Sequence, residues 1–219
     1  MARVLVTGGN RGIGLELCRH YAARGDDVTA VCRTASPELS ALNARVIDGI
    51  DVATADGVES LRGALDEASI DVLINNAGIL LRDDLDNLDF DDVMEQLRVN
   101  SVGPLRVTRA LLDVLAAHAK VAIITSRMGS IDDNTSGGYY GYRMSKTAVN
   151  MAGVSLAKDL EPHGIAVVLL HPGMVATDMT GRRGVDVAHS AQGLVQRIDD
   201  TTLATSGTFW HAEGDRLPW

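Results

Sequence analysis

Short runs of Val, Ile and Leu alternate along the chain with longer segments whose apolar residues recur at helical spacing. The short runs are apolar at consecutive positions, as in strands that are buried on both faces of a parallel sheet. The predicted strands are Arg3–Thr7, Asp27–Cys32, Ala44–Ile47, Asp71–Ile74, Lys120–Thr125, Ile165–Leu170 and Gly207–Trp210. The predicted helices are Gly12–Arg24, Thr54–Ala68, Phe90–His118 and Tyr142–Glu161. This alternation predicts right-handed βαβ units and an α/β fold with a doubly wound sheet.

The length and composition are those of one ordinary globular domain. The chain has 219 residues, of which 46% are hydrophobic and 22% are charged. Such a chain can bury a core without disulfides or metals, and its composition excludes a disordered protein. No repeat or Pro/Gly/Ser-rich linker divides it, so we expect a single domain over residues 1–219. The segment Thr180–Val195, with its Gly-Arg-Arg-Gly stretch, is open to interpretation as a mobile loop.

The charge balance and the cysteines exclude several classes of function. A net charge of −9 argues against nucleic acid or an anionic membrane as a partner, but it allows a small phosphate ligand held by a few arginines. Cys18 and Cys32 form no C-x-x-C pair, so we expect neither a disulfide framework nor a metal site. No signal-like segment begins the sequence and no apolar run reaches ~18–20 residues. We therefore expect a soluble, cytoplasmic protein.

A glycine-rich loop joins the first predicted strand to the first predicted helix. It reads Thr7-Gly8-Gly9-Asn10-Arg11-Gly12-Ile13-Gly14. Glycines in this context allow a tight turn and let the backbone approach a pyrophosphate, which the helix N-terminus stabilises. The spacing is not the Gly-x-Gly-x-x-Gly fingerprint, and no Gly-Lys-Ser/Thr follows as in a Walker loop. We favour a nucleotide site over a turn that binds nothing.

A tyrosine and a lysine stand four residues apart at the start of a predicted helix. The side chains of Tyr142 and Lys146 therefore project from one helix face. A free tyrosine has a pKa of ~10, and a neighbouring ammonium favours the phenolate. The pair is a candidate for proton transfer at neutral pH. Tyr139 and Tyr140 have no lysine four residues on, so we expect them to line the substrate mouth or to pack.

These motifs, in this order, resemble the short-chain dehydrogenase/reductase family. The similarity covers nearly the whole chain, and the stretch from Ser126 to Lys146 is most similar to the small carbonyl-reductase or C-factor-like branch. The resemblance implies a Rossmann-type, seven-stranded parallel sheet in the order 3-2-1-4-5-6-7, with helices on both faces. The matching features are Thr7–Gly14, Asn75-Asn76-Ala77-Gly78, Asn100, Tyr142-x-x-x-Lys146, Pro172-Gly173 and the C-terminal Ser-Gly-Thr-Phe-Trp.

The resemblance also implies a catalytic group and a cofactor site. Tyr142 would exchange a proton with the substrate oxygen and Ser126 would steady that oxygen. Lys146 would also bind the nicotinamide ribose, and Asn100 would hold a water that relays protons from Lys146. The alternative for Asn100 is a polar residue that kinks the helix and is satisfied by backbone. The residues assigned to cofactor binding are Gly8, Asn10, Arg11, Gly12, Ile13, Gly14, Arg33, Asp51, Val52, Asn76, Ala77, Gly78, Tyr142, Lys146, Pro172, Gly173, Val175 and Thr177.

Two serines compete for the place beside Tyr142. Ser126 directly follows the fifth predicted strand and matches the family pattern of a serine, two residues and a glycine. Ser130 lies nearer the usual interval before the tyrosine, so a plain count would select it. We assign the role to Ser126 and attribute the extra length to an insertion in the loop Asp132–Gly141, whose composition tolerates one.

The end of the second predicted strand favours NADP(H) over NAD(H). NAD sites usually place a carboxylate there for the ribose 2′-hydroxyl. This chain has Arg33 instead, and Arg33 with Arg11 could clamp a 2′-phosphate from two sides. The alternative is that both arginines are solvated surface charges. Asp51-Val52 resembles the family's adenine-contacting pair.

The leading hypothesis is an NADP(H)-dependent oxidoreductase that interconverts a carbonyl and an alcohol. The alternatives are a nucleotide-binding regulator or signalling protein without turnover, since fold does not fix function, and an epimerase or dehydratase. The expected partner is a small carbonyl or alcohol substrate. Because the family pairs its long helices between subunits, the resemblance implies a homodimer or homotetramer through Phe90–His118 and Tyr142–Glu161.

Two groups of polar residues outside these motifs receive structural interpretations. His118, His163 and His171 show no ligand spacing, so we expect them to be solvated or locally satisfied. The acidic stretch Asp83–Asp92 is expected to be a helix entry and a solvated face.

Overall fold

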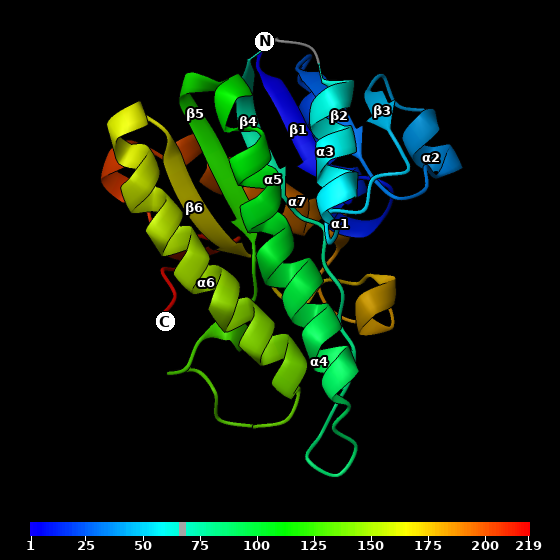
Figure 1. Cartoon of the computed structure of the whole chain (residues 1–219), viewed down its shortest axis with the longest axis vertical. Helices are drawn as coiled ribbons and strands as arrows, with labels where there is room; N and C mark the ends of the chain where they lie inside the picture. Colours follow the sequence, from blue (N-terminus) through cyan, green and yellow to red (C-terminus); the bar gives the residue numbers. More distant parts are fainter. Residues whose placement is uncertain (66–68) are drawn as a thin grey trace.

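The strands of the computed structural model, which describes residues 1–65 and 69–219, form one parallel sheet (Figure 1). The order in the described chain is β3-β2-β1-β4-β5-β6-β7, as predicted, and Val4 of β1 pairs with Val72 of β4. Since β1 is flanked by β2 and β4, the strand order reverses there and opens a crevice at the carboxyl edge. The strands are β1 (Arg3–Thr7), β2 (Asp27–Val31), β3 (Arg45–Ile47), β4 (Ile70–Asn75), β5 (Leu115–Ile124), β6 (Ala166–His171) and β7 (Thr208–His211).

Helices cover both faces of the sheet because successive strand residues point to opposite sides. Val4 and Val6 pack in one cluster with α1 and α7, whereas Leu5 packs in the other with α3, α5 and α6. Figure 1 shows α3, α4, α5 and α6 on one side and α1 and α7 behind the sheet. The α-helices are α1 (Gly12–Ala23), α2 (Pro37–Ser40), α3 (Ala55–Ala64), α4 (Phe90–Leu97), α5 (Gly103–Ala110), α6 (Tyr140–Leu160) and α7 (Val187–Asp200).

The predicted helix Phe90–His118 is wrong as a single element. It is divided into α4, a π-helical turn η1 (Arg98–Val102), α5 and a 3₁₀ turn η2 (Leu112–Val114). Its last residues belong to β5, where Leu115 pairs with Ile70 before a register shift. The apolar run through the end of α5 fits a buried helix and a buried strand equally well, so periodicity does not separate them.

The segment Thr180–Val195 is folded, and the structure corrects its interpretation as a loop. A 3₁₀ turn η5 (Asp178–Thr180) precedes it, and α7 begins at Val187. Between them, Val185 donates to the Met174 carbonyl at 2.8 Å and accepts from Ala176 at 2.9 Å. Helix α7 was not predicted, nor was the short α2. The predicted helix Thr54–Ala68 is confirmed over α3, and its last three residues lie outside the described part of the chain.

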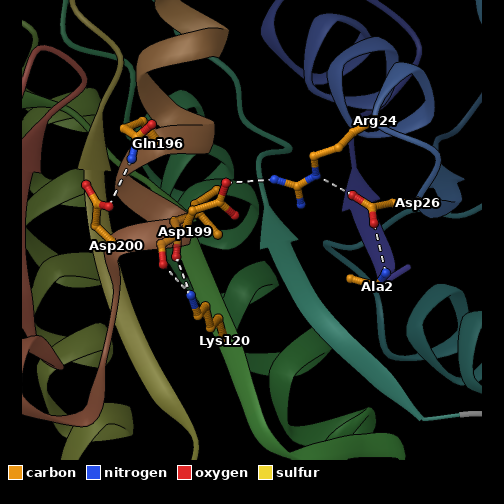
Figure 2. Close-up of polar contacts among 8 residues, drawn as sticks. Ala2, Arg24, Asp26, Lys120, Gln196, Asp199 and Asp200 are labelled. Atoms are coloured by element: carbon orange, nitrogen blue, oxygen red, sulfur yellow. Dashed lines mark hydrogen bonds and ion pairs between the residues drawn. The ribbon is translucent and has the colours of Figure 1, made fainter.

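Helix α7 is held at its C-terminal end by charged side chains (Figure 2). Lys120 of β5 donates to the carbonyls of Ile198 at 3.0 Å and Asp199 at 2.6 Å. Arg24, after α1, pairs with Asp26 at 2.6 Å and with Asp199 at 2.7 Å. A cation at the carbonyl end of a helix satisfies orphan acceptors and complements the dipole. These contacts fix α1 and α7 side by side on one face of the sheet.

None of the helices in the described residues is both long and apolar enough to cross a bilayer.

Candidate active site

The glycine loop turns tightly between β1 and α1. Gly8 and Gly12 have φ of +68° and +53°, in the left-handed region that favours glycine. A Cβ on Gly14 would lie 2.2 Å from the Gly8 carbonyl oxygen, so no larger residue fits there. Ile13 packs against the α1 side of the core. The loop therefore owes its shape to its glycines.

The Asn-Asn-Ala-Gly motif after β4 is bound to this loop. The Asn76 amide donates to the carbonyls of Thr7 at 3.0 Å and Gly8 at 3.2 Å. The Thr7 hydroxyl accepts from the backbone of Asn76 and Ala77. Asn75 donates to Thr108 at 3.1 Å and thereby joins β4 to α5. The predicted cofactor residues of β1 and β4 thus form one rigid edge of the crevice.

The N-terminus of α1 is suited to an anionic group. Arg11 is its N-cap but makes no side-chain capping bond, and its first turn has no acidic residue. The orphan N–H groups of such a helix end, with its dipole, favour a phosphate. Thr177 faces this point, since a Cβ on Gly12 would lie 3.3 Å from the Thr177 methyl group. The residues present therefore fit the pyrophosphate of a dinucleotide.

The two arginines of the predicted clamp lie in neighbouring segments, Arg11 at the start of α1 and Arg33 after β2. Asn10 donates to the Thr34 carbonyl at 3.0 Å and its own carbonyl accepts from Ser36 at 2.7 Å, which holds the segment after Arg33 against the loop. Arg33 is exposed. Arg11 lies 3.9 Å from the Asp178 carboxylate, an exposed ion pair that was not foreseen.

The remaining cofactor candidates surround the same crevice. The Asp51 carboxylate accepts from the backbone of Ala53 at 2.9 Å, and Val52 is buried. Gly173 has φ of +85°, and the Pro172 carbonyl accepts from Ser190 of α7 at 2.7 Å. Val175 is also buried. The segment after β6 is therefore fixed to α7 rather than free.

Tyr142, Lys146 and Ser126 meet at the carboxyl edge of the sheet. Lys146 is only 4% exposed, and its Nζ donates to the Ile124 carbonyl at 3.0 Å. That Nζ lies 5.7 Å from the centre of the Tyr142 ring. Tyr142 is buried and hydrogen-bonds with Ser126, whose hydroxyl also accepts from Met128. The structure thus brings together three of the predicted catalytic residues.

Burial dominates the electrostatics of this group and corrects a simple sequence argument. It raises the pKa of Tyr142 to about 12, opposed only by the hydrogen bond with Ser126. It also lowers the pKa of Lys146 to about 8, because the charged ammonium is poorly solvated. The net pKa of Tyr142 therefore lies above its ordinary value, because burial outweighs the groups that favour the phenolate. Tyr142 is poised as a proton donor.

Asn100 lies in the π-helical turn, and its side-chain amide forms hydrogen bonds within the protein. Its Oδ1 accepts from Ile79 at 2.8 Å, and its Nδ2 donates to the Ile79 carbonyl at 2.9 Å and to Ser145 at 3.0 Å. This matches the structural alternative for Asn100. A Cβ on Gly78 would lie 3.2 Å from Asn100 Oδ1 and 3.7 Å from Lys146 Nζ. Asn100 Oδ1 and Lys146 Nζ therefore both lie on the side of Gly78 where a side chain would project.

The two candidate serines have different partners. The Ser130 hydroxyl accepts from the backbone of Asp133 at 3.2 Å and so supports the loop after the 3₁₀ turn η3 (Arg127–Gly129). Ser126 contacts the tyrosine. This geometry favours Ser126 as the residue that would face the substrate oxygen.

Sequence reasoning missed two polar residues beside the site. The Asp83 carboxylate accepts from the backbone of Tyr140 and Gly141, so it caps α6, whereas Asp89 caps α4 as a helix entry should. His171 is partly exposed, but its Nδ1 is buried without a hydrogen-bond partner, so the expectation for this residue fails at that nitrogen. An acidic residue far from the helix that it caps leaves no local signal. Within the described residues, no group of three or more His, Cys, Asp or Glu is placed to hold a metal.

The fold and the site define a Rossmann-type oxidoreductase that uses a dinucleotide. Residues 2–187 match the family model of the short chain dehydrogenases, and the chain belongs to this family. A 1-hydroxy-2-glutathionyl-2-methyl-3-butene dehydrogenase from Rhodococcus sp. is 42% identical over 226 residues, covering 100% of both chains. The C-signal protein of Myxococcus xanthus is 46% identical over 154 residues, which cover 68% of this chain and 93% of that protein.

Solved structures agree with this family and with its carbonyl-reductase branch. An NADPH-bound carbonyl reductase from chicken fatty liver has a TM-score of 0.93 and 31% identity, over 100% of this chain and 99% of that one. A carbonyl reductase from Pseudomonas aeruginosa in complex with NADP has a TM-score of 0.85 and 32% identity, over 100% of both chains.

Proposed function

We propose that this protein is an NADP(H)-dependent oxidoreductase that interconverts a carbonyl and an alcohol. The observation that carries the proposal is the buried group of Ser126, Tyr142 and Lys146 beside the glycine loop. A group of residues that only stabilised the fold would not require a hydrogen-bonded phenol beside a buried amine at the carboxyl edge of the sheet. Titratable groups with shifted pKa values at this edge are typical of a functional site.

Each residue of the group has a chemical role in reduction. The cofactor, when bound, supplies a hydride for the carbonyl carbon. Tyr142 donates its proton to the carbonyl oxygen, and Ser126 donates a hydrogen bond that stabilises the developing negative charge. Lys146, as an ammonium, stabilises the phenolate that remains, and it also reaches toward the ribose. Asn100 positions Ser145 and Ile79, and we propose that a water beside it connects Lys146 to solvent.

The preference for NADP(H) rests on charge. No carboxylate directly follows β2, and the Asn10–Thr34 hydrogen bond joins the segments that carry Arg11 and Arg33. A 2′-phosphate would replace Asp178 as the partner of Arg11. The chicken carbonyl reductase with bound NADPH and the Pseudomonas carbonyl reductase with NADP support the same preference.

The relatives favour two candidate roles. The Rhodococcus dehydrogenase acts, by its name, on an alcohol that carries a glutathionyl group, so a bulky polar substrate is compatible with this scaffold. The C-signal relative favours a second candidate, a signalling protein that binds nucleotide without turnover. Retention of Asn100, Ser126, Tyr142 and Lys146 favours the enzyme.

An assay of NADPH consumption across a panel of ketones, aldehydes and quinones tests the proposal, with Tyr142→Phe as the inactive control. Consumption that depends on Tyr142 is expected. NADPH binding without consumption would support the regulator, and conversion of a sugar nucleotide without net NADPH loss would support an epimerase.

We also propose that two copies of the chain associate through α4 and α6. Their outer faces expose large apolar side chains, namely Phe90, Met94, Met144 and Met151. Such a patch is typical of an interface. Light scattering should give twice the monomer mass, and Met151→Glu should restore the monomer.

A further inference from the structure

Two histidines lie together where β6 and β7 end. His171 and His211 pair in register, with ring centroids 5.0 Å apart and the rings edge to face. Leu169, two residues earlier on β6, contacts α6, since a Cβ on Gly153 would lie 2.8 Å from it. Residues two apart on a strand face the same way, so His171 lies on the α6 side of the sheet, where the catalytic group is.

His171 is a neutral imidazole with unused hydrogen-bonding capacity. Burial, with His211, Arg127 and Lys146 nearby, lowers its pKa to about 3. Its Nδ1 is buried without a hydrogen-bond partner in the part of the chain that the structure describes. A buried N–H without an acceptor is rarer than an unused lone pair. We therefore assign the proton to Nε2, which makes that nitrogen a donor.

Arg127 brings a cation to the same place. It directly follows Ser126. Thr125, two residues before it, donates to the Leu170 carbonyl at 2.8 Å, so the segment after β5 lies beside His171. Its Nε contacts the Asp133 carboxylate at 2.7 Å, and its side chain is 53% exposed. Among the described residues, Asp133 is the one carboxylate that pairs with this guanidinium, and half of the side chain is open to solvent. The guanidinium remains accessible to a ligand.

We propose that Arg127 and His171 form a subsite for a carboxylate that the substrate carries close to its reacting carbonyl. One carboxylate oxygen would accept from the guanidinium of Arg127 and the other from His171 Nε2. The inference rests on the proposed function and narrows its substrate class to anionic carbonyl compounds, such as 2-oxo acids. A chain with a net charge of −9 repels anions at long range, so such a substrate needs a local cation.

The test uses one carbonyl in two charge states, phenylglyoxylate and its methyl ester, at constant pH with saturating NADPH. The wild type should have a higher kcat/KM for the acid than for the ester. Arg127→Gln should raise KM for the acid about tenfold or more and leave both kcat and the ester's KM nearly unchanged, as expected for loss of a charge-assisted bond made before the transition state. His171→Phe, which keeps an aromatic ring but removes the ring nitrogens, should also raise KM for the acid.

Two further variants serve as matched comparisons. Asp133→Asn frees the guanidinium and should lower KM for the acid. Arg19→Gln removes an exposed arginine that pairs with Glu16 on α1, and it should change neither substrate's KM. The subsite would be overturned if Arg127→Gln raised KM by the same factor for the acid and the ester. It would also be overturned if the wild type had a higher kcat/KM for the ester than for the acid.

A measurement without turnover separates this proposal from the proposed function. Calorimetry of mandelate, the product 2-hydroxy acid, with the NADPH-saturated protein, a pair that cannot exchange hydride, should show binding that Arg127→Gln weakens about tenfold or more. That result would support the subsite even if the protein reduced no carbonyl. In that case the proposed oxidoreductase activity would be wrong and the subsite would stand. Equal mandelate affinity in wild type and variant, or no binding to either, would overturn the subsite.

Discussion

The carboxylate of Asp83 accepts the backbone N–H of Gly141 at 2.9 Å, and so fixes the start of the helix that carries Tyr142 and Lys146. Asp83→Ala should lower the free energy of unfolding by about 1 kcal/mol, typical of a lost helix cap, and should also lower kcat. Asp89→Ala removes the cap of α4 and is the matched control. Urea unfolding and steady-state kinetics would show a similar loss of stability in both variants and a loss of kcat in Asp83→Ala alone. Equal kcat values would contradict the positioning role of Asp83.

Tyr142→Phe should remove most turnover and leave the affinity for NADPH close to that of the wild type. The substitution deletes the proton donor and little volume. Single-turnover kinetics and fluorescence titration of NADPH measure the two quantities. A variant that keeps more than about a tenth of kcat, a loss below ~1.4 kcal/mol, would show that Tyr142 is not the proton donor.

Ser126→Ala should slow turnover by about a hundredfold, since positioned donors contribute ~2–4 kcal/mol to the transition state. Ser130→Ala should have little effect on kcat, because its hydroxyl serves the loop at Asp133. The reverse ranking in a kcat comparison would transfer the assignment to Ser130.

The cofactor preference should appear as a higher kcat/KM for NADPH than for NADH. Arg33→Ala and Arg11→Ala should each reduce kcat/KM for NADPH and leave the value for NADH nearly unchanged, since only NADPH has the 2′-phosphate that they would bind. Equal kcat/KM values for the two cofactors in the wild type would refute the arginine clamp.

His171 should make the protein less stable in acid. Its pKa is lowered to about 3 in the fold, while an unfolded histidine titrates near ~6.5. The unfolded chain therefore binds more protons between these values, and stability falls as the pH drops from about 6.5 toward 3, by at most about 1.4 kcal/mol per pH unit from this residue. Urea unfolding at pH 7 and pH 5 should show that the free energy of unfolding falls less between these pH values in His171→Gln than in the wild type. His163→Gln, which changes an exposed histidine, should behave like the wild type.

The sequence was sufficient for the sheet because its apolar runs are short, separate and fully buried. Val4, Leu5 and Val6 are all below 2% exposed, which only a central strand requires. It was insufficient between Phe90 and His118, where the π-helical turn at Asn100 depends on hydrogen bonds to Ile79 and Ser145, distant in the chain. The capping of α6 by Asp83 was missed for the same reason.

Electrostatics at the candidate site were the other weakness of sequence reasoning. The spacing of Tyr142 and Lys146 correctly predicted that they share a helix face and lie near each other. Spacing carries no information about desolvation, which raises the pKa of Tyr142 and lowers that of Lys146. The depth at which neighbouring elements bury a group is a property of the assembled fold.

The two hydrogen bonds from the Asn76 amide to Thr7 and Gly8 also bear on the thermodynamics of recognition. Because the protein itself holds the glycine loop in its turned shape, a dinucleotide meets a surface that is already organised. Little backbone entropy is then lost on association, and more of the interaction energy appears as affinity. Through these two hydrogen bonds, Asn76 keeps the glycine loop rigid before a ligand arrives.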